Sequence, residues 1–292
     1  MAPDGFLGKC KPLIGVVHLP PLPGSPGYKK LRYPSYNGRL WSLEEIIDFA
    51  VGQASIYRDA GFDAVILENY GDRPYKPRVG KGQLAAMTAI ARTVVKEVDI
   101  VVGINLLRNS GYEAIYAAYI SGASLVRINN LCEVRVSPEG LLAPVARLVA
   151  RALQELDSYS MAYNGRLNIV ADVDVKHSLP LREATLMEST RECVERSGIP
   201  LAGVVVTGRR TGEEPGYEMI EQAAAIAEDL GTRLIIGSGV SAANIARYWG
   251  DADAFIVGTS VKIGERTDNP VDEKKAKSLA RLVKHYRNTM GC

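Results

Sequence analysis

The sequence predicts an α/β protein with one domain, residues 1–292, folded as a single (β/α)8 barrel (TIM barrel). Eight short segments rich in Val and Ile alternate with segments of amphipathic helical pattern, and the length suits eight such units. No linker or change of composition divides the chain. An open, doubly wound sheet is the alternative, but the strand count and the length together favour the closed barrel.

The expected strands begin near Leu13, Asp63, Ile100, Leu125, Leu167, Gly203, Arg233 and Ala254. They are short and β-branched, which is typical of parallel strands that helices cover on the outside. Several helices are expected to end, just before the next strand, at a glycine in the left-handed conformation: Gly61, Gly122, Gly198 and Gly231.

The first and last helices have recognisable beginnings. Ser42 followed by Glu45 predicts a capping box at the start of the helix before the second strand. Asn269 followed by Pro270 predicts an N-cap and first helical residue for the last helix, which should run to about Asn288.

Composition and charge exclude several classes of partner. The chain is 47% hydrophobic and 23% charged with a formal net charge of +2, and its charges form no blocks, so nucleic acid is not expected to bind. No apolar run approaches the roughly 20 residues of a membrane span, and the first residues lack the apolar stretch of a signal peptide. We therefore expect a cytoplasmic protein with a small-molecule ligand, and leave a homo-oligomer open.

Four cysteines are present: Cys10, Cys132, Cys193 and Cys292. None lies at a spacing typical of metal ligands, so free thiols in a reducing compartment are expected. A disulfide between the two terminal cysteines, Cys10 and Cys292, is the alternative, and spacing does not decide it.

Two glycine-rich turns follow the seventh and eighth expected strands, at 237–240 and 258–260. The first leads into an expected helical start at 241–244. Glycine lets backbone N–H groups approach an anion closely, and these two loops are where TIM barrels commonly bind phosphate. The alternative is that both are merely tight turns. The expected phosphate-binding residues are Gly237, Ser238, Gly239, Gly258, Thr259 and Ser260.

The fifth strand carries ionisable residues on one face. Its apolar set, expected to pack under the helices, is Ile169, Ala171, Val173 and Val175. The opposite set should face the barrel interior: Asn168, Val170, Asp172, Asp174 and Lys176. Three ionisable groups in a row are costly to bury unpaired, so they should pair with one another or lie at the open mouth.

Polar residues also end other strands, and active sites of barrels are built at the carboxyl ends of the strands. The expected catalytic residues are Lys176, Asp172, Asp174, Glu68 and His18. The expected ligand-binding residues are Asn105, Arg127, Asn129 and Thr207. For each residue alone, the alternative is a hydrogen bond that only holds a loop.

Lys176 is the central candidate. Beside two carboxylates it stays charged and can anchor an anion, whereas desolvation would make it a nucleophile or base. His18 is a candidate proton carrier, His177 should point to the opposite side, and His285 is expected at the surface. No organic cofactor is indicated. A divalent metal is an open alternative through Glu68 with an aspartate, although no spacing supports a dedicated metal site.

Two connections are too long for simple turns, residues 19–41 after the first strand and 207–216 after the sixth. Both leave the carboxyl end of a strand, so lids or binding loops are expected, with surface decoration as the alternative. The first loop, rich in Pro and Tyr, is expected to be more mobile without ligand than with it.

These motifs together resemble the BtpA family, named for a factor in photosystem I biogenesis. The matching stretches are GVVHLPPLPGSP (15–26), ILENYGDRPY (66–75), GINLLRN (103–109), RINN (127–130), ADVDVKHS (171–178), VVTGRRTGEEP (205–215), IGSGVSAANI (236–245), DAFIVGTSVKIG (253–264) and NPVD (269–272). The resemblance covers nearly the whole chain and implies a TIM barrel. It implies little chemistry, because the family has no agreed reaction, and the chain carries no feature that speaks of photosynthesis.

Three functions follow from these observations. The first is an enzyme acting on a small phosphorylated metabolite by lyase, aldolase or isomerase chemistry, with Lys176 as acid/base or Schiff-base group tuned by Asp172 and Asp174. The second is a metal-assisted hydrolase with Glu68, Asp172 and His18 as ligands. The third is a non-catalytic assembly factor that keeps a ligand site. Ionisable side chains aimed into the mouth favour the enzymes.

Overall fold

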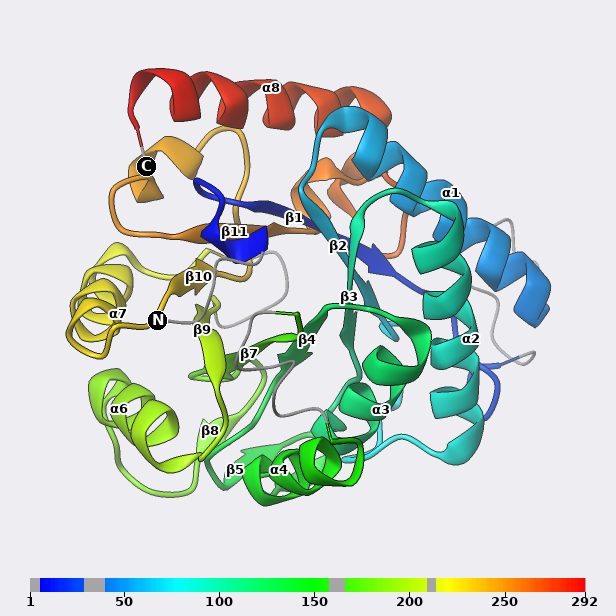
Figure 1. The fold of residues 1–292 in the computed structure, drawn as a ribbon, viewed down its shortest axis with the longest axis horizontal. Coiled ribbons are helices and arrows are strands. Elements are labelled where there is room, and N and C mark those ends of the chain that lie inside the picture. The colour runs from blue at the N-terminus through cyan, green and yellow to red at the C-terminus, as the bar shows by residue number, and fades with distance from the viewer. Residues whose placement is uncertain (1–5, 29–39, 158–165, 209–213, 292) are drawn as a thin grey trace.

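A closed barrel of eight parallel strands forms the centre of the molecule (Figure 1). The computed structural model describes residues 6–28, 40–157, 166–208 and 214–291. The strands, in chain order, are β1 (Leu13–His18), β2 (Ala64–Glu68), β3 (Val101–Asn105), β4 (Leu125–Ile128), β7 (Asn168–Val173), β9 (Leu201–Val206), β10 (Leu234–Ile236) and β11 (Ala254–Val257). Neighbouring strands around the barrel follow the chain, and β1 closes it against β11. All eight predicted strands and the predicted fold class are thus confirmed.

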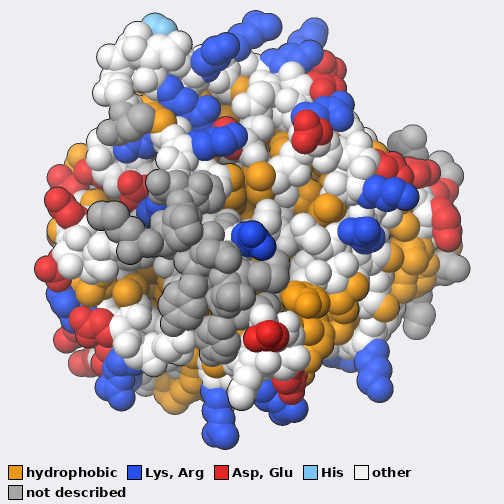
Figure 2. Space-filling model, in the orientation of Figure 1, with side chains coloured by type: hydrophobic (Ala, Val, Ile, Leu, Met, Phe, Trp, Pro, Cys, Tyr) orange, Lys and Arg blue, Asp and Glu red, His pale blue; other side chains and the backbone are white. Residues whose placement is uncertain are grey.

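The helices form a ring outside the strands (Figure 1). They are α1 (Leu43–Ala60), α2 (Lys81–Glu97), α3 (Gly111–Ser121), α4 (Ala146–Glu155), α6 (Leu186–Arg196), α7 (Tyr217–Asp229) and α8 (Glu273–Thr289). None of these described helices is both long and apolar enough to cross a membrane. Figure 2 shows basic side chains over α8, at the top, and acidic side chains over α7, at the left, so this face carries both signs of charge.

Two layers of apolar side chains hold the barrel together. Inward-facing residues such as Ile14, Ile66, Val170 and Ile256 fill its interior, together with Leu7 from the short 3₁₀ helix η1 (Phe6–Gly8). The outward-facing residues pack under the helices in a second cluster. Each fully buried aliphatic side chain contributes about 1.5–3 kcal/mol. The interior is therefore a packed core, and ligands are confined to its rim.

Several predicted helix ends are confirmed. Ser42 and Glu45 form the capping box of α1. The four glycines expected in the left-handed conformation all have positive φ, between 60° at Gly231 and 97° at Gly61.

Other predicted ends were wrong. The N-cap of α8 is Asp272, whose carboxylate accepts hydrogen bonds from the N–H groups of Lys274 and Lys275. Asn269 instead lies in the preceding loop, where its side chain donates to the carbonyl of Ile263. The chain after β10 forms the short 3₁₀ helix η3 (Ile245–Tyr248), so residues 241–244 do not begin an α-helix.

A small antiparallel sheet, which we did not predict from the sequence, flanks the barrel. Its strands are β5 (Arg135–Ser137), β6 (Gly140–Leu142) and β8 (Leu179–Pro180), in the order β6-β5-β8. Two come from the connection after β4 and one from the connection after β7, which are both at the carboxyl ends of barrel strands. Strands of two or three residues give too little alternation to be recognised in the sequence.

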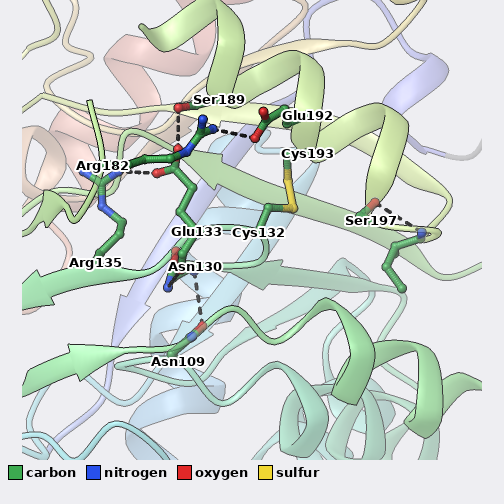
Figure 3. Close-up of a disulfide and its surroundings, with 11 residues drawn as sticks. Asn109, Asn130, Cys132, Glu133, Arg135, Arg182, Ser189, Glu192, Cys193 and Ser197 are labelled. Carbon is green, nitrogen blue, oxygen red and sulfur yellow. Dashed lines mark hydrogen bonds and ion pairs between the residues drawn. A yellow bond between two sulfur atoms is a disulfide. The ribbon is translucent and has the colours of Figure 1, made fainter. Parts of the chain in front are cut away.

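The expectation of free thiols was wrong. A disulfide joins Cys132, after β4, to Cys193 in α6, with Cα atoms 5.4 Å apart, as Figure 3 shows. None of the described cysteines is a free thiol. The two sulfurs meet only in the folded chain, at a separation of 61 residues, so spacing gave no hint of the pair. The alternative pairing involves Cys292, which lies outside the described residues.

Candidate functional site

A cavity of about 410 Å³ opens at the carboxyl ends of the barrel strands. Side chains from four strands or the loops that follow them meet there: His18 at the end of β1, Glu68 at the end of β2, Arg127 in β4 and Lys176 after β7. The rest of its lining comes mainly from the turns after β10 and β11: Gly237, Ser238, Gly239, Val240, Ser241, Gly258, Thr259 and Ser260. The cavity therefore brings most of the predicted catalytic residues to the predicted phosphate-binding turns.

The two turns are joined to each other. The Ser260 hydroxyl donates to the carbonyl of Val240 at 2.6 Å, and the Ser238 hydroxyl accepts from the N–H of Gly208 at 2.8 Å. Gly239 has φ +72°, a conformation that other residues rarely adopt.

Several backbone donors of these turns are unused. The N–H groups of Gly239, Val240, Thr259 and Ser260 donate to no acceptor within the described part of the chain. Converging N–H groups in a concave turn are a binding arrangement for anions. The four residues with unused N–H groups line one cavity, although no α-helix begins directly after β10.

Glycine is required where the turns meet the catalytic candidates. A Cβ on Gly258 would lie 2.8 Å from Cε1 of His18, and one on Gly237 would lie 3.2 Å from Nη2 of Arg127. Contacts below 3.4 Å demand that the neighbour move. The absence of side chains at these two positions therefore lets His18 and Arg127 approach the turns.

Arg127 and Asp172 form a fully buried ion pair. The guanidinium donates from Nε and Nη2 to the two carboxylate oxygens at 2.7 and 2.9 Å, and the Asn129 amide donates to the same carboxylate at 2.9 Å. Both carboxylate oxygens of Asp172 therefore already accept hydrogen bonds, which leaves this residue little capacity to ligate a metal.

Glu68 has a different environment. It accepts a hydrogen bond from the Asn105 amide at 2.8 Å, and Nε2 of His18 lies 3.8 Å from its other oxygen. Burial and then the nearby Lys262, Lys176 and Arg127 lower the pKa of His18 well below its usual value. His18 is consequently a neutral imidazole, able to accept a proton or donate a hydrogen bond.

Lys176 lines the cavity but does not meet the aspartates. Among the described residues, no hydrogen bond or ion pair joins its amine to Asp172 or Asp174. Burial, followed by the charge of Arg127, lowers the pKa of Lys176 to about 8, while Glu68 and Asp172 oppose the shift. Its backbone is held by Arg108, which donates to the Lys176 carbonyl at 2.6 Å.

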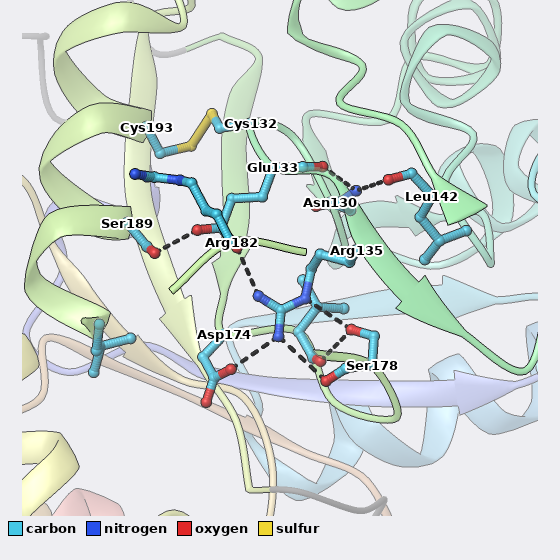
Figure 4. A network of polar contacts seen from close by, with 12 residues as sticks. Asn130, Cys132, Glu133, Arg135, Leu142, Asp174, Ser178, Arg182, Ser189 and Cys193 are labelled. Carbon is cyan, nitrogen blue, oxygen red and sulfur yellow. Dashed lines mark hydrogen bonds and ion pairs between the residues drawn. A yellow bond between two sulfur atoms is a disulfide. The ribbon is translucent and has the colours of Figure 1, made fainter. Parts of the chain in front are cut away.

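The prediction that Asp174 faces the barrel interior was wrong. Strand β7 ends at Val173, and Asp174 has φ +52°, so the alternation of faces stops there. Its carboxylate turns to the small sheet and pairs with Arg135 at 2.9 Å (Figure 4). His177, also at positive φ, is exposed, and so is His285 in α8, as expected.

Lys262 is a member of this neighbourhood that sequence reasoning missed. It follows the turn after β11, is fully buried, and its Nζ has no hydrogen-bond partner among the described residues. Burial lowers the pKa of Lys262 to about 7, against an opposing effect of Glu68. The sequence signal for this residue was weak, because only the folded structure shows that its side chain points inward.

The remaining predicted residues lie beside the cavity. Thr207, directly after β9, is buried, and its hydroxyl has no hydrogen-bond partner in the part of the chain that the structure describes. The described part of the first long loop is anchored, since the Asp72 carboxylate accepts from the Leu22 N–H at 2.7 Å. Residues 29–39 and 209–213 of the two expected lids lie outside the described residues. Within the described chain, no three His, Cys, Asp or Glu residues cluster as metal ligands.

Comparisons with solved structures agree with the fold. A thiamine phosphate pyrophosphorylase of Pyrococcus furiosus superposes with a TM-score of 0.52 at 14% identity, over 96% of this chain and 98% of that one. A phosphoribosyl anthranilate isomerase of Thermus thermophilus gives 0.50 at 13%, over 94% and 100%. At such identities the likeness shows the barrel alone.

Sequence relatives match along almost the whole chain. An uncharacterized protein of Pyrococcus horikoshii is 41% identical over 277 residues, which cover 95% of this chain and 97% of the relative. The photosystem I biogenesis protein BtpA of Synechocystis is 34% identical over 263 residues, covering 89% and 84%. The model of the BtpA family matches residues 9–285. This chain therefore belongs to the BtpA family.

Proposed function

We propose that this protein is an enzyme that acts on a small phosphorylated metabolite by lyase, aldolase or isomerase chemistry. The observation that carries the proposal is the shared cavity. One end offers unused N–H groups from the turns after β10 and β11, and the other offers Glu68, His18 and Lys176. The thiamine phosphate pyrophosphorylase and the phosphoribosyl anthranilate isomerase that share the fold both carry phosphorylated compounds in their names.

In this proposal the turns hold the phosphate and position the rest of the substrate over the strand ends. Fixing one end of a small substrate places its reactive carbon beside the catalytic groups and lowers the entropic part of the barrier. Arg127, tied to Asp172, adds a fixed positive charge to the lining of the cavity close to Gly237.

Lys176 is the proposed acid/base or Schiff-base group. With its pKa of about 8, roughly one tenth of the amine is neutral at pH 7 and about half at pH 8. A neutral amine can take a proton from the substrate. It can also attack a carbonyl carbon, forming a C–N bond while the carbonyl oxygen leaves as water. Glu68 and neutral His18 are placed to carry the protons of either step.

The other two candidates fit less well. A hydrolase that uses Asp172 as metal ligand is disfavoured, because both oxygens of that carboxylate already accept hydrogen bonds from Arg127 and Asn129. An assembly factor is suggested by the name of the Synechocystis relative, a photosystem I biogenesis protein. Assembly alone has no need for two lysines of lowered pKa beside one cavity, which are typical of catalytic sites.

The test is a thermal-shift screen with phosphorylated aldehydes and ketones, followed by borohydride with each compound that stabilises the protein. A reduced adduct on Lys176, located by mass spectrometry and absent from Lys176→Met, is the expected result for the Schiff-base route. A hit that leaves no adduct assigns Lys176 to proton transfer if activity falls in the Met variant. No stabilisation by any phosphorylated compound would contradict the proposal.

A further inference from the structure

The outer surface of the small sheet carries five exposed apolar side chains, which we call the apolar sheet face: Val134, Val136, Leu141, Leu179 and Leu181. Their exposed fractions run from 40% to 73%. The strand pairing makes them contiguous, because Val136 lies opposite both Leu141 and Leu179. Leu181 lies across from Val134, since its N–H donates to the Val134 carbonyl at 2.9 Å.

This face is unusually apolar for a surface sheet. Antiparallel sheets normally alternate between a buried apolar face and a polar face in water. Here the alternate residues Arg135 and Leu142 are the buried ones, so the face that carries leucine and valine points outward. With side chains of ordinary size, these exposed fractions amount to roughly 500 Å² of surface, within the range of the largest patch on a typical monomer.

The sheet beneath the face is rigidly held. Arg135 is fully buried and donates to Asp174, Glu133 and Ser178 (Figure 4). The disulfide Cys132–Cys193 ties the same segment to α6 (Figure 3). A surface that is already ordered loses little conformational entropy when it binds.

The surroundings of the face fit a second copy of the chain. A cavity of about 440 Å³ adjoins it, lined by Cys132, Pro144, Pro180, Val134 and Leu181 and also by the charged residues Glu133, Arg182 and Glu192. Protruding leucines and a cavity that is apolar over part of its wall thus lie on one surface. A two-fold axis would seat the leucines of each copy against the cavity of the other.

The size of the apolar sheet face and the charges around it also favour a second copy of the chain as the partner. A stable interface buries about 800 Å² on each partner, of which about 65% is apolar in homodimers, and this matches the apolar sheet face. The edge of the apolar sheet face carries both signs of charge, because Arg182 pairs with Glu192 there. Such an edge is complementary to a second copy of itself across a two-fold axis, and not to a strongly acidic or basic partner.

We propose that the protein forms a two-fold symmetric dimer through the apolar sheet face. Since Arg135 links this sheet to Asp174, two residues before Lys176, the dimer would also brace the segment that carries the candidate catalytic lysine.

The test is sedimentation equilibrium of the full chain over a wide range of concentrations, for the wild type, Leu179→Glu and Ile120→Glu. Leu179 is 73% and Ile120 60% exposed, so both variants should fold, which their thermal unfolding would verify. Ile120 lies in α3, outside the apolar sheet face, and serves as the matched control.

The expected result is a dimer for the wild type and Ile120→Glu. Leu179→Glu should weaken the dimer by at least about 100-fold, because a carboxylate would be buried at the centre of an apolar interface. A wild type that is monomeric at every concentration would overturn the proposal, as would a dimer that Leu179→Glu leaves intact.

Discussion

Replacing Asp172 by Asn should destabilise the barrel far more than replacing Asp174 by Asn, although the two carboxylates lie two residues apart. Both pair with an arginine at 2.7–2.9 Å. The side chain of Asp172 is completely buried and that of Arg127 only 2% exposed, whereas the side chain of Asp174 is 43% exposed. The same chemical change therefore acts in two different environments.

The magnitudes follow from burial. In Asp172→Asn, Arg127 keeps its buried charge without a counter-ion, and the new amide places a donor against donors of Arg127 or Asn129. Breaking a buried pair in this way costs about 3–5 kcal/mol. In Asp174→Asn the lost pair is open to solvent, and Arg135 keeps Glu133 and Ser178, so about 0–1 kcal/mol is expected. Guanidinium denaturation of both variants gives the comparison, and equal losses would refute the assignment of Asp172 to the buried pair.

Three further predictions concern residues near the carboxyl ends of the barrel strands. Gly237→Ala places a Cβ 2.3 Å from Cγ1 of Val205 and should lower the free energy of unfolding by about 1–3 kcal/mol. The control Gly250→Ala, whose new Cβ meets nothing within 4 Å, should leave it nearly unchanged. Equal thermal unfolding midpoints for the two variants would contradict the close packing at Gly237. Lys176→Met should change the free energy of unfolding by less than about 1 kcal/mol, because Lys176 pairs with neither Asp172 nor Asp174. A larger loss of stability in a denaturation experiment would indicate that Lys176 does pair with one of these aspartates. The free energy of unfolding should rise with pH between about 7, the pKa of Lys262 in the folded protein, and 10.5, its ordinary value, because the unfolded chain binds more protons in this range. Lys262→Met should reduce this slope in denaturation experiments at several pH values. An unchanged slope would contradict the desolvation of the Lys262 amine.

The parts of the fold that repeat could be read from the sequence. Eight Val- and Ile-rich segments located all the barrel strands, and the positions of Gly61 and Gly231 located helix ends, because each signal is local. One error was local, because the sequence offered two possible caps for α8 and Asp272, not Asn269, is the one used. Another arose where a distant contact decides the local structure: after β7 the Asp174 carboxylate turns outward to pair with Arg135 of the small sheet.

The candidate site was predictable to a similar degree. Strand alternation placed His18, Glu68 and Arg127 at the rim, since alternation holds as long as the strand does. It failed for the partner of Asp172, because Arg127 and Asp172 lie on neighbouring strands and their pairing depends on the register of β4 against β7. Lys262 was missed because it follows the last strand in a turn, where no periodicity indicates direction.

The central claim is that the turns after β10 and β11 bind phosphate, and a titration with inorganic phosphate followed by amide NMR tests it most directly. The amides of Gly239, Val240, Thr259 and Ser260 should shift together along one binding curve, because their N–H groups have no acceptor in the described chain and line one cavity. Amides in α8, on the outside of the barrel, should stay unmoved in the same spectra. Shifts confined to other loops, or these four amides unmoved at saturating phosphate, would contradict the claim.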